Sequence, residues 1–332
     1  MTIVLTGGAG FIGSHLAVEF LNAGHEVVIA DNFSGGGQAN LAGIAAITGK
    51  SPKVYDLDVC DEARLTDMFS AENIDLVVHC AGYKPSGRSR ADPIACYQKS
   101  LFPTLTLIKS MSDFGVRKLI FSSSSAVYDI TNQAPYTEEM AAGFCASPFG
   151  TAKFFIEKII TDSINSGLLS TAVILRYFNP AGAHPSGLIG ELTQETSAGL
   201  MASIVRAASG SGPELKIFGQ DFRTRDGTCI RDFIHPLDLA AGHLKALNFI
   251  QTSKGAHVFN LGTGTGCTVM EIIQEFERTN SLKIPFTFSD RRPGDIAESY
   301  ADTTKAAWTL DWKANRNLAD ICRDVWSWQK NQ

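Results

Sequence analysis

The sequence predicts an α/β fold built on a doubly wound parallel sheet, and two observations carry that prediction. From residue 2 to about residue 180, short apolar and β-branched runs alternate with longer stretches that have helical spacing. Three glycines, Gly7, Gly10 and Gly13, follow the first apolar run and open the first helical stretch. Alternating strands and helices form parallel sheets with right-handed crossovers, so the first half is expected to be Rossmann-like.

The strands of the first half are expected to be nearly continuous apolar runs, as parallel strands buried on both faces are. Six are expected: TIVLT (2–6), EVVIAD (26–31), KVYDLDV (53–59), LVVHCAG (76–82), KLIFSSSS (118–125) and TAVILRYFN (171–179). Three helices are expected between them: SHLAVEFLNAG (14–24), EARLTDMFSAEN (62–73) and FPTLTLIKSMSDFG (102–115). The first and the third end at glycines, which suit a helix C-terminus.

The regular alternation ends after about residue 180. Proline and glycine turns then separate isolated helices such as GLMASIVRAAS (199–209) from short strands such as LKIFG (215–219). Two domains are therefore expected: a cofactor-binding domain over residues 1–180 and a smaller mixed α/β substrate-binding domain over residues 181–332. No linker separates them, so the chain is expected to cross between the two.

Composition excludes several classes of protein. The chain of 332 residues has a net charge of −5 and no Lys/Arg run, so no nucleic-acid partner is expected. No stretch approaches about 18 uninterrupted apolar residues. The opening MTIVLTGG lacks the pattern of a signal peptide, so we expect a cytoplasmic protein without a membrane span. Seven scattered cysteines without a C-x-x-C pair argue against a disulfide framework and a zinc site, and no metal is expected.

The glycine triplet predicts a dinucleotide site. Glycines permit a tight turn and a close approach of the backbone to a pyrophosphate, while the helix start at Phe11 and Ile12 offers free amides. The second strand ends in Asp31, 18 residues after Gly13. A carboxylate there can accept both hydroxyls of an adenosine ribose and repels a 2′-phosphate, which favours NAD over NADP. A glycine-rich turn beside a solvated aspartate is the alternative reading.

A series of motifs along the whole chain adds to this reading. They are, in order, TGGAGFIGSH, DLDV, CAGYKPSG, KLIFSSSSAVY, SPFGTAK, LRYFNPAGAHPSG, GTCIRDFIHPLDLA, FNLGTGTG and RRPGDIAESYAD. From Ile3 to the WSWQ at 326–329 the chain resembles the UDP-glucose 4-epimerase family of extended short-chain dehydrogenases/reductases. The resemblance implies an isomerase of carbohydrate (galactose) metabolism that uses bound NAD to oxidise C4 of a UDP-sugar and reduce it again on the other face.

The resemblance also implies roles for individual residues. On the cofactor side, Asp31 and Asn32 would hold the adenosine ribose, Asp58 the adenine, Lys84 the pyrophosphate and Lys153 the nicotinamide ribose. On the substrate side, Ser124 would bind the sugar 4-oxygen, Asn179, Arg231 and Arg292 the diphosphate, Phe218 the uracil, and Asp295 the uridine ribose. Without the family, Arg231–Asp232 and Arg292–Asp295 would read as ordinary ion pairs and Phe218 as core.

One catalytic position departs from the family. Phe149 occupies the place of the tyrosine that precedes Lys153 by four residues, and phenylalanine has no proton to exchange. Other departures are expected to cluster around the sugar and the nicotinamide: Lys99, Phe102, Pro103, Asp129, Gly199 and Ser299. Several changes in one pocket favour a natural lineage over a single engineered change. Tyr83, Lys99 and Cys145 are candidate substitute bases, each with a simpler structural reading.

The function predicted from these residues is an NAD-dependent 4-epimerase of UDP-sugars with an altered active site. Sugar 4,6-dehydratases and 3,5-epimerases are less well supported, because Ser125, Ala126 and Val127 replace the residues that those reactions use in this segment. A catalytically silent relative that binds NAD(H) and a nucleotide sugar is the alternative from another class, and different chemistry on another substrate is a third. By analogy with the family, a homodimer through two helices is expected.

Overall fold

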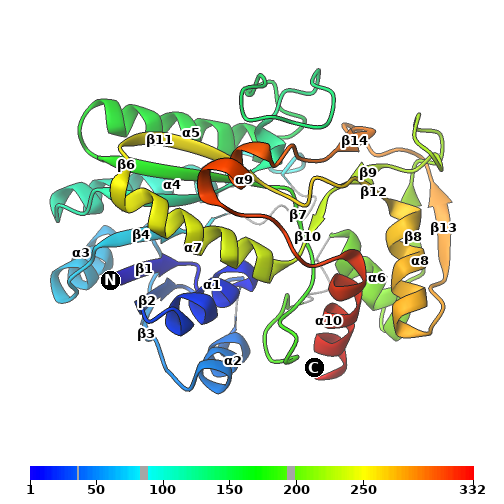
Figure 1. Ribbon diagram of the computed structural model, residues 1–332, viewed down its shortest axis with the longest axis horizontal. Coiled ribbons are helices and arrows are strands. Elements are labelled where there is room, and N and C mark those ends of the chain that lie inside the picture. Colours follow the sequence, from blue (N-terminus) through cyan, green and yellow to red (C-terminus); the bar gives the residue numbers. More distant parts are fainter. Residues whose placement is uncertain (36, 83–88, 193–198) are drawn as a thin grey trace.

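The computed structural model describes residues 1–332 apart from residues 36, 83–88 and 193–198. A seven-stranded parallel sheet in the order β11-β6-β5-β4-β1-β2-β3 spans one half of the molecule (Figure 1). Its strands are β1 (Thr2–Thr6), β2 (Glu26–Asp31), β3 (Lys53–Asp56), β4 (Leu76–His79), β5 (Lys118–Ser124), β6 (Thr171–Tyr177) and β11 (Gly255–Leu261). The predicted Rossmann-like sheet is confirmed.

Helices cover both faces of this sheet, as the double winding requires. On one face lie α1 (Phe11–Asn22), α2 (Gln38–Thr48) and α7 (Pro236–Thr252), and on the other α3 (Glu62–Ala71), α4 (Pro93–Asp113) and α5 (Pro148–Asn165). Each face has its own apolar core, because alternate strand residues point to opposite sides. The carboxyl ends of the strands therefore lie between two well-packed layers, where side chains can be held rigidly.

The six predicted strands are all present, although β3 stops at Asp56 where the prediction continued to residue 59. The third predicted helix is longer than expected. It begins at Pro93, where the Asp92 carboxylate accepts a hydrogen bond from the Ala95 amide, and it runs through Pro103. An Asp-Pro pair is a readable helix start, whereas Pro103 removes one hydrogen bond inside the helix and tends to break it.

The second half of the chain contributes to both parts of the molecule. Strand β11 is an edge strand of the large sheet and helix α7 packs on one of its faces, although both lie beyond residue 180. The remaining elements form a smaller mixed α/β lobe with its own core (Figure 1). They include α6 (Leu200–Ser209), β8 (Leu215–Phe218), α8 (Val269–Asn280), β13 (Phe286–Ser289) and α10 (Leu318–Lys330).

Short strands connect the lobe to the large sheet. Strand β7 (Asn179–Pro180) follows β6 and pairs with β10 (Phe233–Ile234). A three-stranded sheet joins β12 (Cys267–Thr268), β9 (Ile230–Arg231) and β14 (Glu298–Ser299). The single-turn helix η1 (Ser125–Val127) follows β5, and α9 (Thr304–Leu310) packs near β11. Over the described residues, no helix has the length and apolar character that crossing a membrane needs.

Candidate active site

Two positions in the turn between β1 and α1 require glycine. Gly7 has a φ of +72°, and a Cβ atom on Gly13 would lie 2.2 Å from the Gly7 carbonyl oxygen. Helix α1 then begins at Phe11, followed by Ile12, with Gly10 as its N-cap and no side chain bonded to the first amides. These amides remain able to bind an anionic group such as a pyrophosphate.

Asp31 lies at the end of β2 beside this turn. Its carboxylate accepts hydrogen bonds from the Ala9 amide at 2.9 Å and the Phe33 amide at 2.8 Å. Burial raises the pKa of Asp31, and the two amides act in the opposite direction. The Asn32 amide nitrogen donates to the Asp58 carboxylate at 2.9 Å, so these predicted cofactor residues lie together. Lys84 lies outside the described residues.

Lys153 is buried at the carboxyl end of the sheet. Its Nζ atom donates to the Ser122 carbonyl oxygen at 2.8 Å and lies 4.6 Å from the centre of the Phe121 ring. The Phe149 ring centre is 5.9 Å away, one turn earlier on α5. Desolvation by burial lowers the pKa of Lys153 to about 8. The predicted pair at positions 149 and 153 is therefore assembled, with an aromatic ring in place of a hydroxyl.

Glu157 lies one further turn along α5, and its carboxylate is bound by Arg176 and Ser123. Its two carboxylate oxygens accept hydrogen bonds from Arg176 Nε at 3.1 Å and Nη2 at 2.7 Å. The Ser123 hydroxyl donates to the same carboxylate at 2.5 Å. Because all these groups are buried, they fix α5 against β5 and β6 and hold Lys153 in place.

Ser124 ends β5, the strand whose Ser122 carbonyl oxygen accepts the Lys153 hydrogen bond. Its Oγ atom accepts a hydrogen bond from the Ala126 amide at 3.1 Å, which starts η1. A Cβ atom on Gly150 would lie 2.1 Å from the Ala126 carbonyl oxygen, so α5 packs tightly on this turn. The Ser124 hydroxyl keeps its own proton available for donation.

A buried chain of polar groups beside Lys153 was missed by the sequence reading. Cys80 Sγ lies 3.0 Å from Ser122 Oγ, which lies 2.7 Å from the Tyr177 hydroxyl, which lies 2.7 Å from His243 Nε2. The other His243 nitrogen donates to the Leu239 carbonyl oxygen. Three of the four members come from β4, β5 and β6 or directly after them. Strand-end position is the only signal that could have indicated them.

The predicted substrate residues lie on the smaller lobe and its connecting strands. The Arg231 guanidinium donates to the Ile230 carbonyl oxygen at 2.7 Å and to the Ile296 carbonyl oxygen at 3.0 Å. It does not pair with Asp232, whose carboxylate is buried and accepts from Thr263, Gly264 and Ala301. The alternative reading of Arg231–Asp232 as an ion pair is therefore wrong.

Arg292, Asp295 and Phe218 form one cluster. Arg292 Nε lies 3.0 Å from an Asp295 carboxylate oxygen, and its guanidinium lies 4.8 Å from the centre of the Phe218 ring. Asn179 lies on β7, where its backbone amide donates to the Asp232 carbonyl oxygen at 2.9 Å. The ion pair between Arg292 and Asp295 is present, and the half-exposed guanidinium retains donors for an anion.

The residues that depart from the family pattern occupy surface, turn, cap or buried structural positions. Lys99 and Phe102 are exposed on α4, with Phe102 53% exposed, so neither is buried in the site. Cys145 Sγ donates to the Val127 carbonyl oxygen, and burial raises its pKa. Ser299 is buried on β14 and Gly199 is the N-cap of α6. Asp129 binds Thr131 in a turn, and Tyr83 lies outside the described residues.

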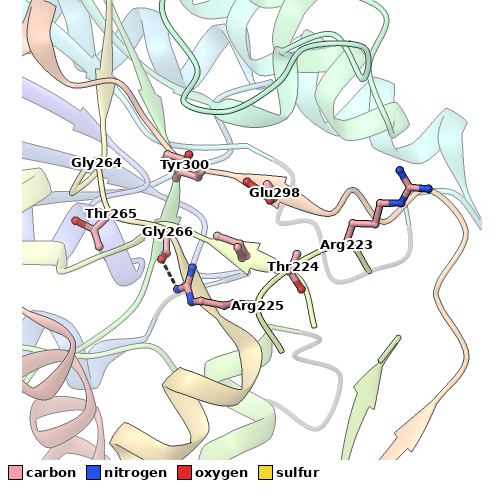
Figure 2. Close-up of a pocket in the computed structure, with 9 residues that line it drawn as sticks. Arg223, Thr224, Arg225, Gly264, Thr265, Gly266, Glu298 and Tyr300 are labelled. Atoms are coloured by element: carbon pink, nitrogen blue, oxygen red, sulfur yellow. Dashed lines mark hydrogen bonds between the residues drawn. The ribbon is translucent and has the colours of Figure 1, made fainter. Parts of the chain in front are cut away.

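A cavity of about 500 Å³ opens on one face of the β12-β9-β14 sheet, opposite to the face that carries the Arg231 and Ser299 side chains (Figure 2). Ile230 and Glu298 line it, whereas their strand neighbours Arg231 and Ser299 point the opposite way, because adjacent strand residues alternate. Arg225 donates to the Gly266 carbonyl oxygen across its floor. The cavity is lined by Arg223, Thr224, Arg225, Ile230, Gly264, Thr265, Gly266, Glu298 and Tyr300. It is separate from the cluster around Lys153.

Curated proteins resemble this chain over its whole length. The UDP-glucose 4-epimerase of Bacillus subtilis (strain 168) is 43% identical over 331 residues, which cover 100% of this chain and 97% of that protein. The UDP-glucose 4-epimerase of Pasteurella multocida (strain Pm70) is 44% identical over 330 residues, covering 99% and 98%. The similarity therefore includes both the sheet and the smaller lobe.

Solved structures give the same result. The crystal structure of UDP-glucose 4-epimerase from Bifidobacterium longum in complex with NAD+ and UDP matches with a TM-score of 0.96 and 43% identity, covering 100% of this chain and 98% of that one. The UDP-glucose-4-epimerase from Stenotrophomonas maltophila with bound NAD and formylated UDP-arabinopyranose matches with a TM-score of 0.95 and 40% identity, covering 100% and 98%.

A family model completes the comparison. The model described as "NAD dependent epimerase/dehydratase family" matches residues 3–262. The resemblance predicted from the motifs is confirmed, as is NAD as the cofactor on which the family depends. Seven parallel strands, a glycine turn that opens α1 and a full-length similarity to UDP-glucose 4-epimerases agree, and the chain belongs to the NAD dependent epimerase/dehydratase family.

Proposed function

We propose that this protein is an NAD-dependent 4-epimerase of nucleotide sugars of the UDP-glucose/UDP-galactose type, with altered proton-transfer groups. The observation that carries the proposal is the full-length similarity to UDP-glucose 4-epimerases, one of which is solved with NAD+ and UDP. The substrate would be a UDP-sugar or a related nucleotide-linked sugar. The reaction would be an isomerisation at C4.

The cofactor side fits an NAD molecule. The glycine turn lets α1 start directly against the end of β1, because a Cβ atom on Gly13 would collide with the Gly7 carbonyl oxygen, and the first α1 amides, which no side chain caps, would bind the pyrophosphate. Asp31, with Asn32 and Asp58 beside it, would hold the adenosine. When bound, NAD supplies the hydride acceptor and donor for C4 of the sugar. Lys153 would hold the nicotinamide ribose.

The substrate side fits a uridine diphosphate. Arg231 and Arg292 offer two planar guanidinium groups that suit the diphosphate, and Asn179 would add a side-chain amide to it. The Phe218 ring would pack on the uracil, and Asp295 would accept the ribose hydroxyls. On NAD binding at the sheet edge and UDP binding at the lobe, the sugar would lie near Ser124, whose hydroxyl would bind its 4-oxygen.

A second candidate function follows from Phe149. A general acid or base typically contributes ~10² to 10⁴ in rate, so a site without the tyrosine hydroxyl can bind both ligands with little turnover. Such a silent relative would bind NAD(H) and a nucleotide sugar for regulation or assembly. It would show NAD affinity by calorimetry without oxidation of a sugar.

Incubation with UDP-galactose and NAD tests the proposal. Formation of UDP-glucose, followed by chromatography, is the expected result for the protein and at a higher rate for Phe149→Tyr. Absence of conversion in both proteins, with NAD binding retained, would contradict the epimerase and favour the silent relative. Absorbance of enzyme-bound NADH after addition of a sugar nucleotide would argue against the silent relative.

The dimer and the cytoplasmic location are also proposals. Helices α4 and α5 pack side by side, and large apolar side chains are exposed on α4 (Ile94, Phe102 and Leu105), on α5 (Phe155) and just after α5 (Leu168). An apolar surface of this kind is typical of contacts between copies of a chain. Sedimentation should give a dimer, and replacing Phe102 and Phe155 with Glu should give a monomer. A parent protein that sediments as a monomer would overturn this proposal.

A further inference from the structure

The proposed epimerisation needs a group that takes the proton of the sugar 4-hydroxyl, and Phe149 cannot supply one. The described side chains around Lys153 limit the choice. His79 and His243 are buried, and each has both ring nitrogens in hydrogen bonds. Burial lowers the pKa of His79 to about 3 and that of His243 to about 4. Neither imidazole is placed to accept a further proton.

The Cys80 thiol is also a poor acceptor. Burial raises its pKa to about 11, although the hydrogen bond to Ser122 and the nearby Lys153 oppose this shift. At pH 7 a thiol with that pKa is ionised in only about one molecule in 10⁴. Its hydrogen bond also points into the chain that ends on His243. Cys80 therefore remains a protonated neighbour.

Lys153 has unusual surroundings for a buried ammonium. In the part of the chain that the structure describes, its Nζ has one hydrogen bond, to the Ser122 carbonyl oxygen. Two aromatic rings, Phe121 and Phe149, lie beside it. The carboxylate that acts on it, Glu157, is bound by two Arg176 nitrogens and by Ser123. Among the described residues, no carboxylate therefore forms an ion pair with this amine.

The ionisable groups that act on Lys153 are Glu157 on its own helix and Cys80 directly after β4. Cys80 and Glu157 favour the charged amine, whereas desolvation opposes it more strongly. His79, directly before Cys80, is neutral because of its burial. The balance leaves the neutral amine accessible near neutral pH, which is the range in which a general base is most effective.

We propose that Lys153 is itself the proton acceptor in this protein, with the Ser124 hydroxyl as the carrier between the sugar 4-oxygen and the amine. The proposal rests on the proposed epimerase function and deepens it. A tyrosine at position 149 would carry its hydroxyl on a ring whose centre lies 5.9 Å from the Lys153 amine. Here Phe149 keeps the ring without the hydroxyl. Ser124 lies two residues after Ser122 at the end of β5, and the Ser122 carbonyl oxygen accepts the Lys153 hydrogen bond.

The proton step is balanced. The O–H bond of the sugar 4-hydroxyl breaks as its proton moves to Ser124 Oγ, and the Ser124 O–H bond breaks as its proton moves to the neutral amine. An N–H bond forms and Lys153 becomes an ammonium. No electrons change hands in this step, and the same proton returns when the sugar is reduced. The amine holds one proton more in the ketone intermediate than in the reactant state.

Substitution of Lys153 in two backgrounds tests the proposal. Arginine keeps a positive charge and hydrogen-bond donors but does not lose its proton at these pH values. In the Phe149 protein, Lys153→Arg should lower the rate of UDP-galactose conversion by ~10² or more. In a Phe149→Tyr background, where the phenol takes the proton, the same change should cost about ten-fold less. Equal losses in both backgrounds would overturn the proposal.

The pH profile gives a second readout. With a Lys153 pKa of about 8, the rate for the Phe149 protein should rise about ten-fold per pH unit below that pKa and level off above it. Phe149→Tyr should shift the midpoint. Ser124→Ala should lower the plateau without moving the midpoint. A rate that is flat between pH 6 and about 9 would contradict a lysine base.

A titration without turnover completes the test. The ¹³Cε resonance of Lys153, assigned by its loss in Lys153→Arg, should titrate near pH 8 in the NAD-loaded protein, and a midpoint above about 10 overturns the proposal. If Phe149→Tyr converts UDP-galactose and the Phe149 protein does not, the proposed function stands and the lysine base is wrong. If neither protein converts it, both are wrong.

Discussion

Lys153 Nζ lies 5.9 Å from the centre of the Phe149 ring, one turn apart on α5. The ring thus occupies the position from which a tyrosine would present its hydroxyl to the sugar and to the amine. The first prediction is that Phe149→Tyr raises the rate of UDP-galactose conversion by ~10² to 10⁴. Conversion under saturating UDP-galactose, with NAD content measured in the same sample, checks it.

Phe149→Leu is the matched control for that experiment, because it also lacks a hydroxyl but keeps an apolar side chain. It should leave the rate within a few-fold of the parent. An equal increase for leucine and tyrosine would mean that removing the ring, and not restoring a proton, changes the rate.

The buried Lys153 amine also affects stability. Its pKa of about 8 in the folded protein is below the ordinary lysine pKa of 10.5, so the unfolded chain binds the proton more tightly. The cost of burying the charge is therefore fully present below pH 8 and disappears as the pH rises toward 10.5. At about 1.4 kcal/mol per unit, that cost is about 3 kcal/mol.

The second prediction is that Lys153→Met increases the free energy of unfolding of the NAD-free protein at pH 7. Most of this gain should be lost by pH 10, because the wild-type amine is then neutral in the folded state. Urea unfolding at both pH values measures it. Lys158→Met, on the exposed side of the same helix, is the control and should show no such pH dependence. A gain that is equal at pH 7 and pH 10 would contradict the low pKa.

The ion pair between Glu157 and Arg176 supports the third prediction. Both side chains are buried, and the two-pronged geometry leaves either partner as an uncompensated charge when the other is removed. Glu157→Gln should therefore lower the free energy of unfolding by about 3 to 5 kcal/mol. Asp162→Asn removes an exposed ion pair on the same helix and should change it by less than about 1 kcal/mol. Similar losses for both variants would show that the buried pair is not special.

Local signals explain which parts of this site the sequence predicted. The Gly7–Gly13 turn and the strand that ends at Asp31 are close in the sequence, with one helix between them, so their spacing alone predicted that they lie together. Arg292 and Asp295 are three residues apart, and they pair as that spacing suggests. Strands such as β4 and β6 were readable for the same reason, because each is a single buried run.

Contacts between distant segments explain the rest. Ser122 and Tyr177 are 55 residues apart, and Tyr177 and His243 are 66 apart, so no local pattern joins them. Strand β11 could not be assigned to the large sheet from its residues, because an apolar run does not state which strand it pairs with. Pro103 stands inside α4 because tertiary packing overrides its helix-breaking tendency.

The fourth prediction concerns the choice between NAD and NADP. The Asp31 carboxylate is held in place by the amides of Ala9 and Phe33, so a 2′-phosphate on the adenosine ribose would meet a fixed negative charge. Asp31→Ser removes that charge and the acceptor for the ribose hydroxyls. NAD affinity measured by calorimetry should fall about ten-fold or more, and the ratio of NADP to NAD affinity should rise, because hydrogen bonds to charged groups are worth about 1.5 to 3 kcal/mol. Asp56→Asn, exposed on the neighbouring strand β3 in register with Asp31, removes the same charge nearby and should leave the ratio unchanged. If both variants change the ratio equally, the combined negative charge of this sheet edge selects the cofactor, and the contact of Asp31 with the ribose does not.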